Sequence, residues 1–359
     1  MTQTATSTLL PDGQGPTPGA AVDLVLARVA DFLAAESARW AATDAELGVV
    51  PKVIADYVAR GGKRLRPSFL LAATLAAGGD PRAAAAIDAG AALELLHAFA
   101  LIHDDIMDGS MQRRGAPALH VDLSAAHAAA QFRGESRRFD EGMAVLVGDL
   151  ALVYADRLMP RHEGVRDLWD ELRIELTMGQ HLDLTAAASG DRGPSRARRI
   201  ADLKSGRYTV VRPLHLGAAL TNRFGELQGV LQRYGQPVGQ AFQLRDDLLG
   251  LFGDPETTGK PTGDDLREGK ATFVLAVAHE RANSRQRRVL DLVGRADLQP
   301  DDVDRLRELI RRTGAVAIVE HTIDDLLDQG VAALGDPRLA AEGRAALESL
   351  AVNATRRMY

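Results

Sequence analysis

Two aspartate clusters, each at the end of a long apolar helical run, constrain this chain more than any other feature. The first contains Asp104, Asp105 and Asp108, and the second begins with Asp246 and Asp247. On a helix, residues four positions apart share one face, so Asp104 and Asp108 point into the same space with Asp105 beside them. Such carboxylates suit Mg²⁺, which binds few protein ligands and completes its shell with water and phosphate oxygens. The pattern therefore indicates metal-bridged diphosphate chemistry.

The composition is that of an ordinary globular protein with a large core. Of the 359 residues, 46% are hydrophobic and 26% are charged, which fits one helical domain of this length. The net charge of -6 argues against a dedicated nucleic-acid binder. The chain has no cysteine, which excludes disulfides and cysteine-based zinc sites and fits a reducing compartment. We therefore predict a cytoplasmic protein.

The N-terminal segment, residues 1–20, is predicted to be a flexible tail. It mixes Thr, Pro, Gly and Gln and lacks the basic start and apolar core of a secretion signal. The most apolar stretch, residues 83–102, is about long enough to cross a bilayer. Because it contains Asp88, Glu94 and His97, we expect a buried helix and no membrane span.

Residues 21–359 are predicted to form a single all-α domain of many helices. Helix-forming residues are abundant, and the alternating β-branched runs of strands are scarce. Pro67 falls where the first turn of a helix tolerates proline. We expect the polar segment 127–141 to be a loop before a helix that starts near Met143. Helix breakers occur at 61–62, 78–81, 189–194 and 253–269.

Five motifs in register resemble the isoprenyl diphosphate synthases, also called polyprenyl synthetases. The resemblance runs from about Val49 to Thr272 and is carried, in order, by Gly61-Gly62-Lys63-Arg64-Leu65-Arg66-Pro67, His97, Asp104 to Asp108 with Arg113-Arg114-Gly115, Asp246-Asp247 with Gly259-Lys260, and Glu268-Gly269-Lys270. It implies an all-α isoprenoid synthase fold around a deep central cavity. It also implies Mg²⁺-dependent, head-to-tail condensation of isopentenyl diphosphate with an allylic diphosphate, usually in a homodimer.

The same resemblance assigns roles to the matching side chains. Two Mg²⁺ ions would be held by the first cluster and a third by the second, about three per site; the ligands would be Asp104, Asp105, Asp108, Asp246 and Asp247. The allylic diphosphate would be bound by Arg113, Lys204, Ser205, Gln243, Lys260 and Lys270. Isopentenyl diphosphate would be bound, without metal, by Lys63, Arg66, His97 and Arg114. Catalysis would stabilise the charge that appears on the diphosphate when the allylic C–O bond breaks.

Two positions depart from the family pattern. Gly250 stands where many members carry a third aspartate, with Asp254 nearby, and Ser205 stands where threonine is common. We interpret both as variation among active enzymes and expect Gly250→Asp to be tolerated. The C-terminal residues 356–359 resemble basic tails that close over the isopentenyl site in some relatives.

Product length is predicted from the residues that precede the first metal aspartate. Phe99 and Ala100 lie five and four positions before Asp104, about 6 to 7.5 Å back along a helix. In the family, an aromatic residue at only the farther position, without an insertion inside the aspartate motif, resembles a C20 synthase. We therefore expect Phe99 to form the cavity floor and geranylgeranyl diphosphate to be the product, with farnesyl diphosphate as the second choice.

Three alternative classes stay open on the sequence. A class I terpene cyclase shares the fold but would replace Asp246-Asp247 with an Asn/Ser/Glu metal motif and would lack the isopentenyl pocket. A silent partner subunit of a sister synthase would tend to lose carboxylates or lysines, whereas the first motif is intact here. A di-iron carboxylate protein would need Glu-x-x-His pairs, and His97 and His103 are not so placed.

Overall fold

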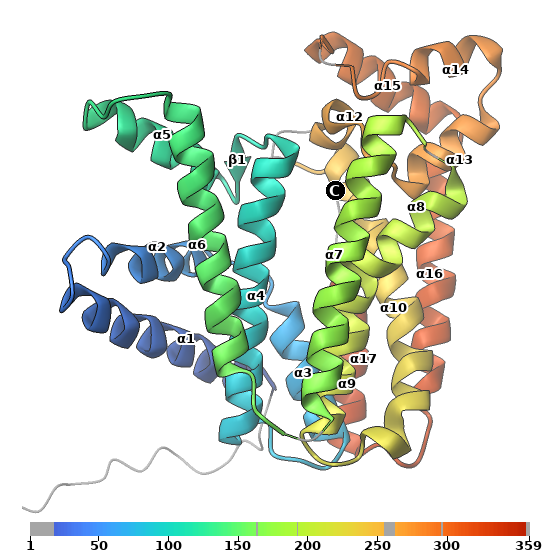
Figure 1. The fold of residues 1–359 in the computed structure, drawn as a ribbon. Coiled ribbons are helices and arrows are strands. Elements are labelled where there is room, and N and C mark those ends of the chain that lie inside the picture. The colour runs from blue at the N-terminus through green and yellow to red at the C-terminus, as the bar shows by residue number, and fades with distance from the viewer. Residues whose placement is uncertain (1–17, 163, 192, 255–262, 296, 357–359) are drawn as a thin grey trace, which may run out of the picture.

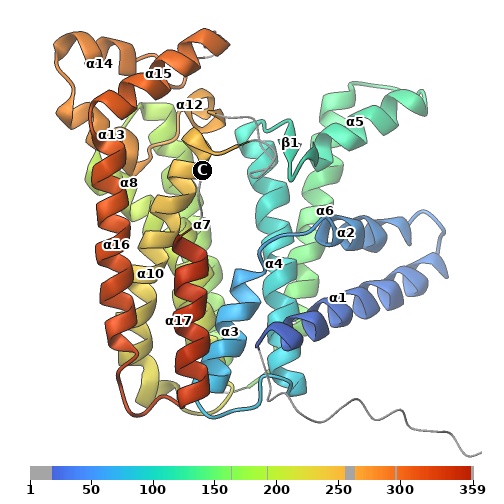
Figure 2. The ribbon, with the colours of Figure 1, turned by 180° about the vertical axis from the view of Figure 1, so that it is seen from behind.

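The computed structural model describes residues 18–162, 164–191, 193–254, 263–295 and 297–356. Two groups of helices stand side by side in it, one from each half of the chain (Figures 1 and 2). Helix α3 (Leu65–Ala76) connects the groups, because it packs against α4 of the first group and against α9 and α17 of the second.

The N-terminal group is built around α4 and α6, which pack against each other. From its far side project α1, α2 and α5 (Figure 2). Its helices are α1 (Pro18–Ala41), α2 (Val49–Ala59), α4 (Ala84–Asp108), α5 (Leu119–Ala129) and α6 (Ser136–Leu158).

The C-terminal group has α10 at its centre, in contact with α16 and with η1, a π-helix. Its helices are α7 (Val165–Ser189), α8 (Pro194–Ile200), η1 (Ala201–Val211), α9 (Arg212–Ala219), α10 (Phe224–Phe252), α12 (Asp264–Glu268), α13 (Phe273–Arg281), α14 (Ser284–Leu290), α15 (Pro300–Arg312), α16 (Ala315–Ala333) and α17 (Ala341–Thr355).

Close backbone packing holds η1 between α7 and α10. A Cβ atom on Gly179 of α7 would lie 2.8 Å from the Cα of Lys204, and one on Gly239 of α10 would lie 2.8 Å from the carbonyl oxygen of Gly206. Only glycine permits both approaches without a shift of backbone. These contacts set the position of Lys204, which η1 carries.

Helix α4 lies in the core of the N-terminal group. Leu93, Leu95 and Leu96 are fully buried, and Glu94 is 3% exposed. Among the described residues, α4 is the one helix long and apolar enough to cross a membrane, and 67% of its most apolar window is buried inside the fold. The core helix of a globular protein can have the same length and composition. The sequence predicted such a buried helix for this segment.

The all-α class is confirmed, and the strands among the described residues are limited to one hairpin. Its strands, β1 (Gln112–Arg113) and β2 (Ala116–Pro117), pair antiparallel with Arg113 opposite Ala116. The turn between them places Arg114 and Gly115 at positive φ.

Two expectations about element boundaries differ from the structure. The predicted loop 127–141 is too long, because α5 continues to Ala129 and α6 already starts at Ser136, which limits the loop to residues 130–135. Polar surface side chains made a solvent-facing helical turn resemble a loop. Helix α1 begins at Pro18, so residues 18–20 are not tail; residues 1–17 lie outside the described part.

A buried histidine makes stability depend on pH. His215 of α9 is 6% exposed, and neither ring nitrogen has a hydrogen-bond partner among the described residues. Burial, with the charge of Arg212, lowers the pKa of His215 to about 4. The unfolded chain takes up this proton near an ordinary pKa of about 6.5, so the free energy of unfolding should fall by about 3 kcal/mol from this group between about pH 7 and 4.

Urea unfolding of His215→Leu at both pH values tests this expectation. The acid-induced loss of unfolding free energy should be smaller in the variant by about 3 kcal/mol. His321→Leu is the matched control, because the side chain of His321 is 80% exposed. The acid-induced loss of unfolding free energy in this variant should equal that of the unmodified protein. The same loss in all three proteins would exclude His215 as the source.

Candidate active site

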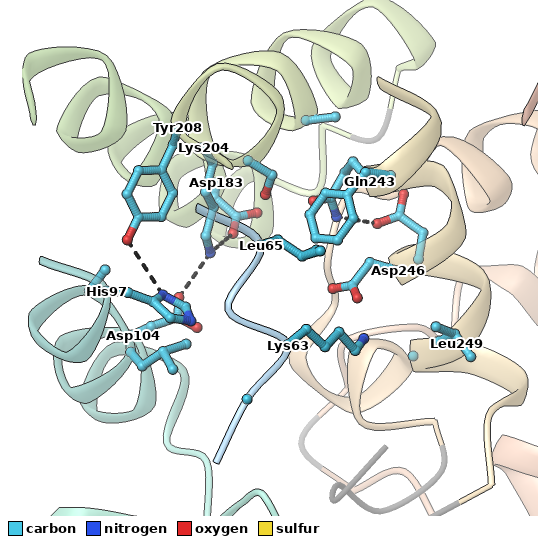
Figure 3. Close-up of a pocket in the computed structure, with 18 of the residues that line it drawn as sticks. Lys63, Leu65, His97, Asp104, Asp183, Lys204, Tyr208, Gln243, Asp246 and Leu249 are labelled. Atoms are coloured by element: carbon cyan, nitrogen blue, oxygen red, sulfur yellow. Dashed lines mark hydrogen bonds and ion pairs between the residues drawn. The ribbon is translucent and has the colours of Figure 1, made fainter. Parts of the chain in front are cut away.

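A cavity of about 1020 Å³ lies between the two groups of helices. Its walls come from the loop before α3 and from α4, α7, η1, α10 and α12. Figure 3 shows Asp104 and Asp246 on helices at opposite sides of this cavity. The predicted site residues that line it are Lys63, Arg66, His97, Arg113, Arg114, Lys204, Ser205, Gln243, Asp246, Asp247, Lys270 and Asp104.

Asp104 is the carboxylate of the first cluster that lines the cavity. Lys204 donates to its Oδ1 at 2.9 Å and to Asp183 of α7 at 2.6 Å (Figure 3). The amide of Gln180 donates to the same Asp104 oxygen at 3.2 Å. Burial opposes the charge on Asp104, but Lys204, Lys270 and Arg113 outweigh burial and hold the pKa of Asp104 well below its usual range. Asp104 is therefore an anion at neutral pH.

Asp105 is not among the cavity-lining residues and is 1% exposed. The Arg113 guanidinium donates to its Oδ1 from Nε, at 2.8 Å, and from Nη2. The same Nη2 lies 3.2 Å from Asp104 Oδ2. Burial opposes the charge on Arg113, but the two aspartates raise its pKa. Asp105 thus holds Arg113 beside Asp104, and its contact with a metal ion stays a prediction.

Asp108 contacts the second lysine of the site. Lys270 Nζ lies 3.1 Å from Asp108 Oδ2, 3.7 Å from Asp265 Oδ1, and also forms an ion pair with Glu268. Burial, together with the charges of Asp104 and Glu268, raises the pKa of Asp108 to about 6 despite Lys270. A lysine thus bridges the end of α4 to α12.

The second cluster divides between an open and a buried carboxylate. Asp246 is exposed to the cavity, whereas Asp247 is 6% exposed and accepts a hydrogen bond from Gln243 Nε2 at 2.7 Å. Burial raises the pKa of Asp247 well above its usual range, and the neighbouring Asp265 and Asp246 add to the shift. Asp246 is the member of this pair that can bind a cation without leaving a buried position.

The donor set fits Mg²⁺ bound jointly by protein and substrate. Among the described residues, no three carboxylate or histidine side chains form a ready-made metal cage. Mg²⁺ retains several water or phosphate ligands and takes one or two carboxylates, so separate carboxylates on facing walls suit it. Lys204 and Lys270 place positive charge beside Asp104 and Asp108.

A cationic region, formed by Lys63, Arg66 and Arg114 around His97, lines the same cavity. The Arg66 guanidinium lies over the Tyr208 ring, 4.1 Å from its centroid, and the Tyr208 hydroxyl lies 3.4 Å from His97 Nδ1 (Figure 3). Burial and the charges of Arg66 and Arg114 lower the pKa of His97 well below its ordinary value. His97 is therefore a neutral hydrogen-bonding group among permanent cations.

The loop that carries Lys63 and Arg66 is anchored by the residue between them. Arg64 adopts a left-handed conformation with φ of 49° at the start of α3. Its guanidinium forms an ion pair with buried Glu94 and donates to the Val58 carbonyl at 2.6 Å. Arg64 thus holds the loop to the scaffold, whereas the side chains of Lys63 and Arg66 line the cavity.

Several functional candidates were missed from the sequence. Gln180 and Asp183 are three residues apart on α7, and Tyr208 is four residues after Lys204; a search for polar side chains at helical spacing would have found them. Asp265 has no such local signal. Phe99 is not among the lining residues, because a helix turns about 100° per residue and directs it to His103, 4.6 Å between ring centroids. Lys260 and residues 357–359 lie outside the described part of the chain.

Fold and site together define a class of protein, the helical enzymes that bind diphosphates with carboxylates, lysines and a divalent cation. The Polyprenyl synthetase family pattern matches residues 49–310. The chain is 32% identical to geranylfarnesyl diphosphate synthase of Aeropyrum pernix, covering 72% of this chain and 79% of that protein. It is 31% identical to geranylgeranyl diphosphate synthase of Mycobacterium tuberculosis, covering 77% and 75%.

Among solved structures, geranylgeranyl pyrophosphate synthase from Corynebacterium glutamicum, complexed with isoprenyl diphosphate and magnesium, is similar throughout. Its TM-score is 0.89 at 38% identity, covering 94% of this chain and 99% of that one. The chain belongs to the polyprenyl synthetase family and is a prenyltransferase of isoprenoid biosynthesis. The predictions of the family, the fold and the enzyme class are confirmed.

Proposed function

We propose that the chain condenses isopentenyl diphosphate with allylic diphosphates and releases geranylgeranyl diphosphate (C20) as its main product. The observation that carries the proposal is that Asp104 of the first cluster, both aspartates of the second cluster and the loop with Lys63 and Arg66 line one cavity. The named products of the relatives support a chain length near C20. A single domain over residues 21–359 is part of the proposal, because helices from both halves of the chain form the cavity walls.

In this proposal one end of the cavity binds the allylic diphosphate. Bound Mg²⁺, about three ions per site, would supply Lewis-acid stabilisation of the charge on the diphosphate. Lys204, Lys270 and Arg113 would donate charge-assisted hydrogen bonds to its oxygens, with Ser205 and Gln243 as neutral donors. The residues that would hold the ions are Asp104, Asp108 and Asp246, with Asp105 and Asp247 behind them.

The other end of the cavity would hold isopentenyl diphosphate. Lys63, Arg66 and Arg114 would bind its phosphates, and neutral His97 would donate a hydrogen bond. The allylic C–O bond breaks with its electron pair on the leaving diphosphate, and the π-bond of isopentenyl diphosphate forms the new C–C bond. Formation of that bond leaves a carbocation on the isopentenyl unit. Loss of a proton from the carbon next to the cation forms the double bond of the product, and the proton passes to the released diphosphate, so no separate protein base is needed.

The product assay tests the proposal. Purified protein is incubated with Mg²⁺, isopentenyl diphosphate and dimethylallyl, geranyl or farnesyl diphosphate, and the products are sized by chromatography. Ala100 lines the cavity, so Ala100→Phe should fill space used by the growing tail and shorten the main product from C20 to C15. Phe99→Ala is the paired variant: the sequence predicts a longer product, whereas the Phe99 ring packs against His103 and is not among the cavity-lining residues.

The outcomes separate the alternatives. A C15 product from the unmodified enzyme would contradict the C20 assignment, and no product with any primer would favour a silent partner subunit. If Ala100→Phe shortens the product and Phe99→Ala leaves it unchanged, the floor moves to the apolar lining residues Leu101 and Leu176.

We include a cytoplasmic homodimer in the proposal. Helices α6 and α7 both present large apolar side chains to solvent: Leu146 and Val153 are 60% and 58% exposed, and Ile174 and Met178 are 52% and 54% exposed. Figure 1 shows both helices on the face of the molecule that is turned toward the viewer, α6 in the N-terminal group and α7 in the C-terminal group. An apolar surface of this kind is typical of an interface between subunits. Light scattering should return twice the chain mass of 38.4 kDa, and the monomer mass would remove this part of the proposal.

A further inference from the structure

Arginine side chains gather on the outer side of the C-terminal group, over α8, α13 and α14. Residues 194–200 and 280–291 hold seven arginines and two carboxylates, in a chain whose net charge is -6. Helix α8 contacts α13, and the Arg198 guanidinium lies over the ring of Phe273 at the start of α13, 4.7 Å from its centroid. Figures 1 and 2 both show α8, α13 and α14 following one another along the same side of the molecule. These segments form one basic surface in a chain that is acidic as a whole.

The charge of this surface is not compensated by the part of the chain that the structure describes. Six exposed arginines of these segments have no ion pair with a described carboxylate, and we call them the arginine surface: Arg198, Arg199, Arg281, Arg285, Arg287 and Arg288. Arg281 donates to the Thr313 carbonyl at 2.7 Å, which orients its guanidinium without neutralising it. By contrast, Arg338 pairs with Asp336 at 2.7 Å on another part of the surface. Like charges on one surface repel each other, so their excess indicates an anionic partner from outside the chain.

Helix α14 is held in a fixed orientation. Asn283 and Gln286 form a capping box at its start, where the Asn283 side chain accepts from the Gln286 amide at 3.0 Å. Leu290 at its end is buried. Arg285 and Arg288 are three residues apart on this helix and share one face. The helix therefore presents its arginines together, on ordered backbone.

Helix α8 connects the arginine surface to the cavity. Ala197 and Ile200 are buried and line the cavity, whereas Arg198 and Arg199 of the same short helix are exposed. One face of α8 is thus part of the cavity wall, and its other face is part of the basic surface. The arginine surface begins one helix away from the site.

We infer that the arginine surface docks the enzyme on a bilayer that contains anionic lipids. The guanidinium fork binds two phosphate oxygens at once, and basic side chains are attracted to the negative surface potential of an anionic leaflet. The choice of a lipid partner rests on the proposed function, because geranylgeranyl diphosphate carries a C20 tail that partitions into a bilayer. Docking one helix away from the cavity holds the enzyme next to the phase that takes up this product.

A nucleic acid fits this surface less well. Proteins that bind single strands combine basic grooves with aromatic side chains on which the bases stack. Among the described residues of α8, α13 and α14, no exposed side chain is large and apolar. The chain as a whole is acidic and would repel an extended phosphate backbone. Because no apolar side chain inserts into the lipid, docking is electrostatic, reversible and sensitive to salt.

Sedimentation of the full-length protein with vesicles tests the inference. The vesicles consist of phosphatidylglycerol mixed with phosphatidylcholine, or of phosphatidylcholine alone, and binding is measured at low and at high ionic strength. The surface variant replaces three arginines whose side chains make no hydrogen bond within the described part of the chain: Arg199→Gln, Arg285→Gln and Arg288→Gln. The control variant removes the same charge from three exposed arginines elsewhere: Arg82→Gln, Arg133→Gln and Arg161→Gln.

The unmodified protein should bind vesicles that contain phosphatidylglycerol and not those of phosphatidylcholine alone, and high salt should release it. A basic residue near an anionic bilayer contributes about fivefold to binding, so the surface variant should bind roughly 100-fold more weakly. The control variant should stay within about fivefold of the unmodified protein. Without vesicles, kcat and KM should be unchanged in both variants, because none of the six replaced side chains lines the cavity.

Failure to bind phosphatidylglycerol vesicles at low salt would overturn the inference, as would an equal loss of binding in the surface and control variants. Binding of a DNA or RNA oligonucleotide through the arginine surface, without vesicle binding, would also overturn it and would assign the surface to nucleic acid. If circular dichroism shows that the surface variant does not fold, Arg199→Gln alone decides, with an expected loss of about fivefold.

Failure of the proposed function is distinguishable, because vesicle binding needs no turnover. A protein that binds the vesicles and forms no prenyl product with any primer contradicts the proposed function alone. A protein that forms the product and does not bind the vesicles contradicts the inference alone.

Discussion

Replacing Asp104 with alanine should lower kcat/KM by about 10³-fold or more, the largest single effect expected in this chain. Asp104 is the one carboxylate of its cluster that lines the cavity, and both Lys204 and Arg113 contact it. Alanine at position 104 removes the predicted metal ligand. It also removes the carboxylate that Lys204 and Arg113 both contact. Steady-state kinetics with saturating Mg²⁺ measures the loss.

The loss should arise from the site and not from unfolding. Asp104 lies near the C-terminal end of α4, and the leucine side chains that anchor this helix in the core, Leu93, Leu95 and Leu96, precede it. Helix content measured by circular dichroism should therefore be unchanged. Asp328→Ala is the matched control, since Asp328 is an exposed aspartate of α16. Activity of Asp104→Ala within tenfold of the unmodified enzyme would be incompatible with the metal assignment.

The second large effect separates the two substrates. Arg66→Ala should raise the KM for isopentenyl diphosphate about 10- to 100-fold, because a charge-assisted hydrogen bond to phosphate is worth about 1.5 to 3 kcal/mol. The KM for the allylic substrate should change much less, since Arg66 lies over Tyr208 next to His97, in the cationic region. Initial rates with each substrate varied in turn give both constants.

Arg113 is the comparison on the allylic side, and Arg113→Lys is a sharper change than Arg113→Ala. The alanine variant would remove the ion pair between Arg113 and buried Asp105, and breaking a buried ion pair typically costs about 3 to 5 kcal/mol of stability. Lysine retains the charge and removes the planar fork that can bind two phosphate oxygens. Its effect should fall on the allylic KM; equal effects on both substrates from both variants would show that the cavity is not divided in this way.

The sequence alone was enough for the fold class, the family and a set of candidate site residues, most of which line the cavity. Helical periodicity is local, and the motifs are short runs of consecutive residues, so both can be recognised without knowing what lies opposite. The spacing of His97, Ala100 and Asp104 at three and four residues already indicates one face of one helix, and the structure has these three side chains lining the cavity.

Only the tertiary structure decided what each carboxylate touches. Asp104, Asp105 and Asp108 look equivalent in the sequence, yet the angle at which α4 meets its neighbours directs Asp104 to the cavity, Asp105 to Arg113 and Asp108 to Lys270. The approach of Asp265 on α12 to Gly250 on α10 depends on how two separate helices pack. Helical phase relative to the rest of the fold, and contacts between helices, come from packing over long sequence separations, which no local pattern of residues records.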